Sequence, residues 1–418
     1  MDMLPLSVIV LFAVFLVIAI RKILWFKPRI WQIMLFGAVA VLVSGQISAQ
    51  QAILSINYEV IITLFGLFVI GEAVDRSDYL SKIFRSAMNG IKSVDRMMIV
   101  LIFSIGMLSM VLMNDTLAII GTPLLLKISK KYNLNPKMLL YSLAFSITVG
   151  SVTSPIGNPQ NLLIAATGGL KSPFIAFFAH LFIPTMINLL VVYLFVRLIF
   201  REEFGKEIKD HLQEQASDPE LERFAKISLA LLVLLIIGYS AAPYVIPNLK
   251  VGLWEVAPIA ILPILLFSKR RVEVVKNIDW STLLFFASLF IVVQSAWDTG
   301  FFQRVVAGAG LAPSNPINIF ATGIVLSQFI SNVPFVALYL NIMKSLPFNS
   351  LSLLALAAGS TIAGNLTMLG AASNVIIVNG AEKRHEEGIT FFGFLKIGIF
   401  MTLANAAVYL FFLHFNIL

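Results

Sequence analysis

One acidic residue lies in the middle of an apolar stretch. Asp115 is flanked by Asn114 and Thr116 within a mostly apolar block at 97–126. A charged Asp inside a bilayer costs roughly 2.5–3.5 kcal/mol on insertion scales, so it usually has a function or a partner. We therefore expect Asp115 to bind a cation or to carry a proton. The alternative is that this polar tip only caps its own helix.

A second polar motif interrupts a block that is too long for one plain span. A helix over residues 138–167 would be about 45 Å long, whereas the bilayer core is about 30 Å thick. The later part of the block contains two prolines and a glycine, so we expect the helix to unwind there. Freed carbonyls and side-chain amides could then bind a cation or an anion; an ordinary loop after Val152 is the alternative. The candidate residues are Thr153, Ser154, Gly157, Asn158 and Asn161.

Both motifs have counterparts in the second half of the chain. Residues 148–164 align with 361–377 without a gap, and one Thr, one Gly, one Asn and one Ile recur at a constant spacing of 213 positions. The tip at 114–116 falls on the tip at 331–333 with a spacing of 217 positions. The second-half candidates are Ser331, Asn332, Thr367, Gly370, Ser373 and Asn374. We expect one shell of ligands from each half.

A third match lies upstream, where residues 78–84 resemble 300–306 at a spacing of 222 positions. Two membrane helices can share small residues by composition alone, because Gly is common in such helices. Three matches in the same order nevertheless predict an internal repeat. An odd number of crossings in each half would place the second half upside down relative to the first, as in many secondary transporters.

The composition indicates the elements that must position these residues. Of the 418 residues, 59% are hydrophobic and 12% are charged, against about 45–50% and about 25% in soluble domains. The net charge of +8 is explained by cytoplasmic loops rather than by nucleic acid. The sequence has no cysteine and no motif of a hydrolase or nucleotide-driven pump, so we predict no enzyme, no thiolate metal site and no cofactor apart from sodium as a coupling ion.

The apolar blocks and the basic residues between them predict an all-α polytopic membrane protein with two inverted repeats, each of five crossings plus one re-entrant hairpin. Both termini are expected outside. The repeats would span residues 1–200, with a hairpin at 97–126 and a broken helix at 138–167, and residues 224–418, with a hairpin at 316–343 and a broken helix at 350–380. A cytoplasmic linker at 201–223 would join them.

These motifs resemble those of the ion transporter superfamily, namely the citrate transporter-like and arsenical-pump-like permeases and, more distantly, the divalent anion/sodium symporters. The resemblance is carried by the tip at 114–116, the string at 154–161 and the string at 364–374. It implies a scaffold and two transport domains, often in a dimer, that move like an elevator. The symporters have Ser-Asn-Thr at each tip, and here each tip lacks one of the hydroxyls. This difference argues against dicarboxylate recognition, while Asp115 favours a cation or a proton.

The sequence therefore predicts a secondary active transporter in a bacterial or archaeal inner membrane. It would move a small anionic solute, coupled to Na⁺ or H⁺, by alternating access. Efflux of arsenite or antimonite and Na⁺/H⁺ antiport are the alternatives. The expected partners are the solute or ion, the lipid bilayer and a second copy of the chain; substrate, direction and stoichiometry stay open. Sodium is expected near Asn114, Asp115, Gly157, Asn332 and Gly370.

Overall fold

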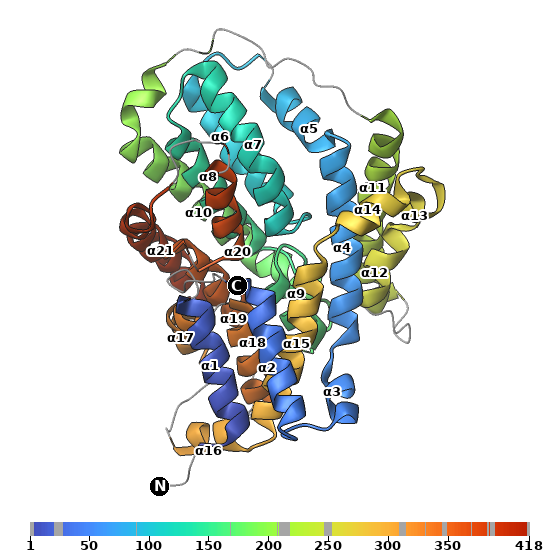
Figure 1. The fold of residues 1–418 in the computed structure, drawn as a ribbon. Helices are drawn as coiled ribbons and strands as arrows, with labels where there is room; N and C mark the ends of the chain where they lie inside the picture. The colour runs from blue at the N-terminus through green and yellow to red at the C-terminus, as the bar shows by residue number, and fades with distance from the viewer. Residues whose placement is uncertain are drawn as a thin grey trace.

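The computed structural model describes residues 4–415, apart from 21–27, 89, 168, 207, 209–217, 246–252, 309–314, 331, 345–348, 369, 383 and 385–388. Within these residues all regular secondary structure is helical (Figure 1). Polar residues begin several of the helices by accepting a hydrogen bond from a free backbone amide. The side chains that do so include Asn57, Ser93, Asn135, Asp279, Asn349 and Thr390.

One set of helices packs around α4 and α15, and we call it the α4–α15 group. In this group α2 packs against α15, and α4 packs against α11, α12 and α15. The members are α1 (Leu6–Ile20), α2 (Ile30–Val43), α3 (Ala49–Ser55), α4 (Tyr58–Arg76), α11 (Pro219–Val245), α12 (Leu253–Ala260), α13 (Leu262–Phe267), α14 (Arg271–Asn277) and α15 (Trp280–Trp297).

The other set, which we call the hairpin group, contains the interrupted helices. Its first part is α6 (Val94–Leu108), α7 (Asn114–Tyr132), α8 (Pro136–Ser151), α9 (Pro159–Thr167) and α10 (Pro173–Ile199). Its second part is α17 (Pro316–Ile330), α18 (Asn332–Lys344), α19 (Ser350–Ile362), the short 3₁₀ helix η2 (Ala363–Asn365), α20 (Ala372–Glu382) and α21 (Phe391–His414). Before these parts come α5 (Tyr79–Met88) and α16 (Phe301–Gly308), and η1 (Arg201–Gly205) follows α10.

The order of elements is the same in the two halves. Each half contains, in order, a short helix, two helices joined at a polar tip, two helices separated by a loop, and one long helix. These are α5–α10 in the first half and α16–α21 in the second. Asp78 before α5 and Gly300 before α16 both have left-handed backbone angles, with φ of 55° and 68°. The tip residue Ser331 lies outside the described residues, as does part of the linker expected at 201–223. The inverted relation of the halves stays a prediction.

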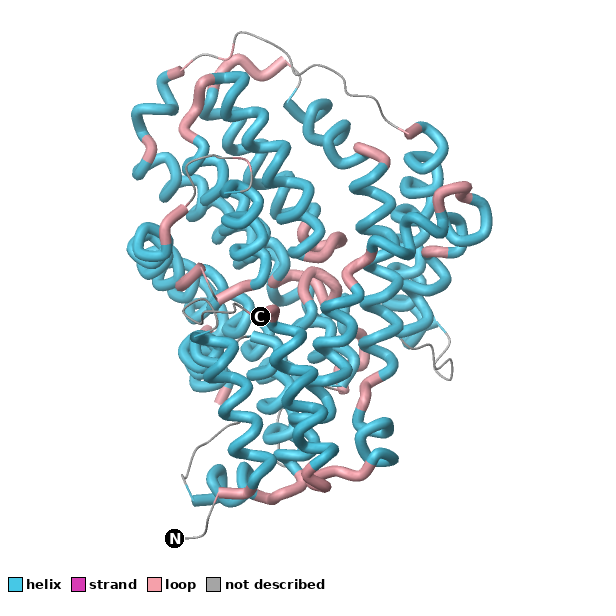
Figure 2. Tube along the Cα trace, viewed as in Figure 1, coloured by secondary structure: helices cyan, strands magenta, loops and turns pink. Residues whose placement is uncertain are grey.

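Both breaks are real interruptions of the helices. The α8 helix ends at Ser151 and α9 begins at Pro159, while α19 ends at Ile362 and α20 begins at Ala372. Figure 2 shows loops in the middle of the molecule, between helices above and below them. Non-helical backbone at such a depth is tolerated in a membrane only where it faces protein or a water-filled cavity.

Glycines bring the tip helices close to the broken helices. A Cβ on Gly150 of α8 would lie 2.2 Å from the backbone oxygen of Gly106 on α6. A Cβ on Gly359 of α19 would lie 2.4 Å from the backbone oxygen of Phe320 on α17. Small residues permit this backbone approach between membrane helices. The first helix of each hairpin is therefore packed closely against the helix that precedes the break of its own half.

Four described helices are long and apolar enough to cross a membrane alone: α10, α15, α21 and the Pro219–Ala242 part of α11. The α3 and α4 helices, bent by 55° at their junction, form a fifth candidate. Large apolar side chains are exposed on many helices, for example Phe36 and Phe392. In a bilayer, lipid covers apolar surfaces of this kind. The exposed apolar side chains and the apolar helices together indicate an integral membrane protein. The expected ten crossings stay a prediction.

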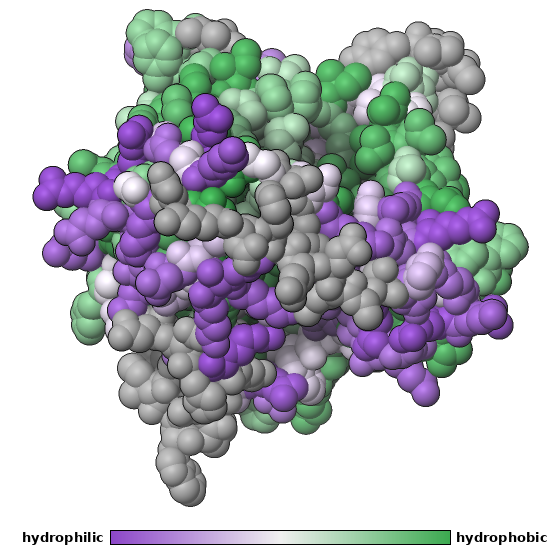
Figure 3. Space-filling model, turned by 90° about the horizontal axis from the view of Figure 1, so that it is seen from above, coloured by the Kyte–Doolittle hydropathy of each residue, from purple (hydrophilic) through white to green (hydrophobic). Residues whose placement is uncertain are grey.

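Charged residues join α4 and α5 to α11 and α14. Glu222 pairs with Lys82 and Lys226, and Arg76 pairs with Glu72 and Glu273. Seen from above, many hydrophilic side chains gather on this end of the molecule (Figure 3). Because basic loops stay in the cytoplasm, this end is the one that we expect inside.

Candidate functional site

A cavity of about 270 Å³ lies where the interrupted helices meet. The first residue of each of four helices lines it: Asn114 of α7, Pro159 of α9, Asn332 of α18 and Ala372 of α20. Each helix N-terminus carries a partial positive charge of roughly half an elementary charge, because its first amides lack helical partners. The cavity thus faces four positive helix ends.

The opposite wall comes from the α4–α15 group. Ile30 and Trp31 of α2 line it, together with Ser281, Thr282, Phe285 and Phe286 of α15. The cavity therefore lies between the two groups of helices and has both polar and aromatic walls. No Lys or Arg is among its described lining residues.

Candidates from both halves line this one cavity. These are Asn114, Asp115, Asn158, Asn332, Gly370 and Ser373. Thr116 lines a neighbouring cavity instead. The remaining described candidates lie outside the lining: Thr153, Ser154, Gly157, Asn161, Thr367 and Asn374.

Other polar residues, which were not among the site residues predicted from the sequence, also line the cavity. Thr148 and Thr361 both line it, and so do Gln160, Ser281 and Thr282. Thr148 and Thr361 begin the two aligned strings, so their identity at a spacing of 213 positions was a usable signal. The residues of α15 carried no such signal, because nothing in the local sequence indicates which helix faces the breaks.

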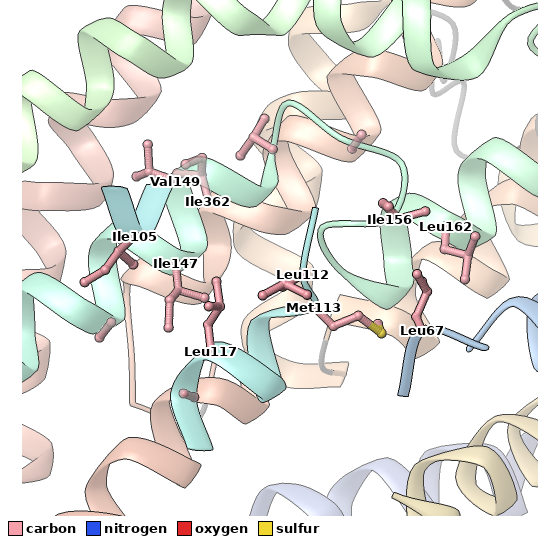
Figure 4. Close-up of a cluster of buried hydrophobic side chains, with 14 of the residues drawn as sticks. Leu67, Ile105, Leu112, Met113, Leu117, Ile147, Val149, Ile156, Leu162 and Ile362 are labelled. Carbon is pink, nitrogen blue, oxygen red and sulfur yellow. The ribbon is translucent and has the colours of Figure 1, made fainter. Parts of the chain in front are cut away.

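The first tip is bonded directly to the first break. The backbone amide of Asn114 donates to the carbonyl of Gly157 at 3.1 Å, and the Asn114 Nδ2 donates to Ser151 Oγ at 3.2 Å. Ser109 Oγ donates to Asn114 Oδ1 at 3.0 Å. Apolar contacts surround this junction, where Met113 and Ile156 belong to one buried cluster (Figure 4). The tip and the break are therefore joined by hydrogen bonds and by apolar packing.

Two asparagines hold the breaks in the same way. Asn161 Nδ2 donates to the carbonyls of Ser151 and Ser154, ten and seven positions earlier, at 3.0 and 3.1 Å. Asn374 Nδ2 donates to the carbonyl of Gly364 at 2.7 Å and to that of Thr367 at 3.4 Å, again ten and seven positions earlier. Both asparagines are almost fully buried. They stabilise the loop backbone and do not contact the cavity.

Replacing Asn161 with Ala is expected to lower the free energy of unfolding by about 1–3 kcal/mol, because buried carbonyls lose their donor. Asn374→Ala is expected to lower it less, because Asn161 also accepts a hydrogen bond from Thr361 Oγ1 at 3.2 Å. Thermal unfolding in detergent would measure both, with the exposed Asn318→Ala as the control. Equal unfolding midpoints for all three variants would contradict this role.

The second half leaves buried oxygen atoms without donors. In the described part of the chain, Asn332 Oδ1, Ser373 Oγ and Asn374 Oδ1 have no hydrogen-bond partner. An unpaired buried oxygen is costly, so such atoms usually have a ligand or a water. Hydroxyl and amide oxygens are suitable for a hard cation such as sodium. Among the described residues, no three His, Cys, Asp or Glu side chains are grouped for a transition metal.

The first half differs, because its amide groups are occupied by protein. Asn158 Oδ1 accepts from the backbone amide of Asn161 at 2.9 Å. Asn158 Nδ2 donates to Ser151 Oγ at 3.1 Å and to Thr361 Oγ1 at 3.2 Å. Among the predicted site residues of the first half that line the cavity, Asp115 is therefore the one whose side-chain oxygens have no hydrogen-bond partner in the described part of the chain.

Asp115 lines two cavities at once. It faces the central cavity and also a second one of about 290 Å³, which Glu72, Asp75, Thr116 and Asp279 line as well. No described residue forms a hydrogen bond or an ion pair with its carboxylate. A carboxylate between two cavities, without a protein partner, can bind a cation or exchange a proton with either side.

Comparison with known proteins shows the family to which the chain belongs. Residues 14–350 match the family described as citrate transporter. An uncharacterized transporter of Mycobacterium tuberculosis is 27% identical over 92% of this chain and 94% of its own length. The inner membrane protein YbiR of Escherichia coli K12 is 30% identical over 69% of this chain and 72% of its own.

The fold is also found in a solved structure. The YdaH transporter of Alcanivorax borkumensis has a TM-score of 0.54 with 14% identity, over 85% of each chain. At this identity the likeness concerns the fold alone. The predicted resemblance to citrate transporter-like permeases is confirmed by the match over most of the chain. The chain is therefore a membrane transporter that belongs to the citrate transporter family.

Proposed function

We propose that the protein is a secondary active transporter that moves a small anionic solute, coupled to Na⁺ or H⁺, by alternating access. The convergence of four helix N-termini on one cavity carries this proposal. Half-helix N-termini that point at anionic groups are a recurrent device in transporters with broken helices. Because the described lining has no Lys or Arg, these helix ends and the polar side chains would supply the attraction for the anion.

The coupling ion would complete the site. A sodium ion could bind the unpaired oxygens of Asn332 and Ser373, and Asp115 could bind a second cation or a proton. A cation in either place would offset the repulsion between the solute and the Asp115 carboxylate. Binding of the anion would then depend on the ion, which is what coupling requires.

Uptake into proteoliposomes tests the proposal. Labelled citrate and smaller mono- and dicarboxylates would be offered under an inward gradient of Na⁺, of H⁺ or of neither. Uptake of one of these anions that rises with either gradient is the expected result. If no anion is taken up and arsenite crosses instead, the protein is a metalloid permease.

A second candidate function is Na⁺/H⁺ antiport, which the unpartnered Asp115 favours. In this mechanism Na⁺ and H⁺ compete for one carboxylate, and no organic solute is needed. Dissipation of a preformed proton gradient by added Na⁺, in the absence of any organic anion, would favour it over the symporter.

Replacing Ser373 with Ala is expected to raise the Na⁺ concentration for half-maximal uptake by about tenfold, if one oxygen ligand is worth about 1.4 kcal/mol. Ser327→Ala is the matched control, because the Ser327 hydroxyl is also buried and unpaired but does not line the cavity. An unchanged Na⁺ dependence for Ser373→Ala would remove this residue from the site.

We also propose that the two halves are inverted repeats, that both termini face outside and that the protein functions as a dimer in a bacterial or archaeal inner membrane. The equal order of elements and the equal spacing of the two asparagine contacts support the repeat. Cysteine labelling from each side of the membrane would test the orientation, and the mass of the complex in a native membrane extract would test the dimer.

A further inference from the structure

A buried ladder of amides connects α10, α21 and the second break. Asn405 Nδ2 donates to Asn188 Oδ1 at 2.9 Å, and Asn188 Nδ2 donates to the backbone oxygen of Asn405 at 3.3 Å. Asn365 Nδ2 donates to Asn405 Oδ1 at 3.1 Å. All three side chains are fully buried. Both ends of the Asn405 amide are thus occupied, one by the first half of the chain and one by the break.

The α21 helix also packs closely against the segment that contains Asn365. A Cβ on Gly398 would lie 2.4 Å from the backbone oxygen of Asn365 and 2.6 Å from that of Leu366. Positions 398 and 405 are two helical turns apart on one face of α21. The helix therefore contacts the break at two points, one through the backbone and one through the Asn405 side chain.

Asn188 and Asn405 occupy matched places in the two halves. Asn188 and Asn405 are 217 positions apart, as are Thr185 and Thr402. The two hairpin tips have the same spacing. If the halves are repeats, Asn188 and Asn405 bond to their own counterparts, as expected for residues on a pseudo-two-fold axis.

The ladder extends to only one of the two breaks. At the spacing of 213 positions, the counterpart of Asn365 is Val152, whose side chain has no hydrogen-bonding group. The first break has a different contact with α10, from Thr153 Oγ1 to the carbonyl of Leu181 at 3.5 Å. A long contact of this kind is weak. The second break, which has the unpaired oxygens, is therefore the one bound more firmly to the α10–α21 crossing.

We propose that Asn405 is a positioning residue, which fixes the second break against α10 through Asn188 and Asn365. Gly364 and Thr367 accept from Asn374, whose neighbour Ser373 lines the cavity. A shift of the η2 segment would thus move the oxygen atoms that face the ion. Asn405 does not line the cavity itself. The effect on ion binding rests on the proposed transport function, whereas the effect on the break does not.

Hydrogen–deuterium exchange tests the structural part without any transport. In Asn405→Leu we expect the amides of residues 363–368 to exchange at least about tenfold faster than in the wild type, while those of 152–158 stay unchanged. Asn365→Ala removes only the contact at the break and leaves the Asn188–Asn405 pair intact. It should give the same local result if Asn405→Leu cannot be purified.

Uptake kinetics test the functional part. Both variants should raise the coupling-ion concentration for half-maximal uptake by about tenfold and leave the maximal rate within about twofold of the wild type. Thr185→Val is the matched control, because it removes the bond of 2.7 Å to Tyr409 at the same helix crossing without contacting the break. This control should lower the unfolding midpoint and leave the ion dependence unchanged.

Three results would decide whether Asn405 positions the second break and whether this positioning affects ion binding. Unchanged exchange at 363–368 in both variants would overturn the proposal, as would an equal effect of Thr185→Val on the ion dependence. Faster local exchange with no ion-driven uptake, even in the wild type, would sustain the positioning role and reject the transport mechanism. The two proposals can therefore fail independently.

Discussion

Replacing Asp115 with Asn is expected to reduce ion-driven uptake by about 100-fold or more, while the protein remains folded. A charge pair at 4 Å contributes about 4 kcal/mol at an effective dielectric constant of 20, and each 1.4 kcal/mol is a factor of about ten. Asn keeps the shape of the side chain and removes only its charge. Because no described residue pairs with this carboxylate, the change leaves no protein cation unpaired.

Asp298→Asn is the control for this experiment. Asp298 is an exposed acid at the end of α15 and lines neither of the two cavities. Uptake driven by Na⁺ and uptake driven by H⁺ would be measured separately for both variants. If Asp115→Asn keeps wild-type coupling under both gradients, Asp115 has no part in the mechanism and the cap interpretation of the tip is favoured.

Replacing Gly157 with Ala is expected to reduce uptake to about one tenth or less and to lower the free energy of unfolding by about 1–3 kcal/mol, as overpacking does elsewhere. A Cβ at this position would lie 2.7 Å from the backbone oxygen of Ser151 and 2.8 Å from that of Ser109. These are backbone atoms, so no side chain can rotate away. The first break and the first tip would have to move apart.

Gly238→Ala makes the same chemical change where no atom lies within 4 Å of the new methyl group. Gly238 belongs to α11, where Ala also has the higher helix propensity. We expect this control to retain uptake and stability. Comparable losses in the two variants would mean that the close packing at Gly157 has no special importance for transport.

The tips and breaks could be found from the sequence because they conflict with their surroundings. Asn114 and Asp115 are polar residues within an apolar block, and the prolines around Gly157 exclude a continuous helix. Such conflicts are local and depend on residue type and spacing alone. The same reasoning identified Gly370, through its match with Gly157 in the first half.

The roles within the site could not be assigned in this way. Asn161 and Asn158 stand three positions apart in one motif, yet Asn161 bonds to the loop backbone while Asn158 faces the cavity. The direction of each amide depends on where the unwound backbone turns. Similarly, Asn188 and Asn405 lie in long and mostly apolar helices, and their pairing becomes visible only where α10 and α21 cross.

The sequence by itself determined that this is a helical membrane protein, that four of its segments are interrupted and which residues mark the interruptions. These properties follow from hydrophobicity, helix length and the backbone limits of proline and glycine, all of which act over a few neighbouring residues. The tertiary structure decided that residues of both halves line one cavity, that α2 and α15 form its other wall and that its unpaired oxygens, those of Asn332 and Ser373, belong to the second half. Those features depend on helices far apart in the chain, whose packing brings together atoms that no local pattern relates.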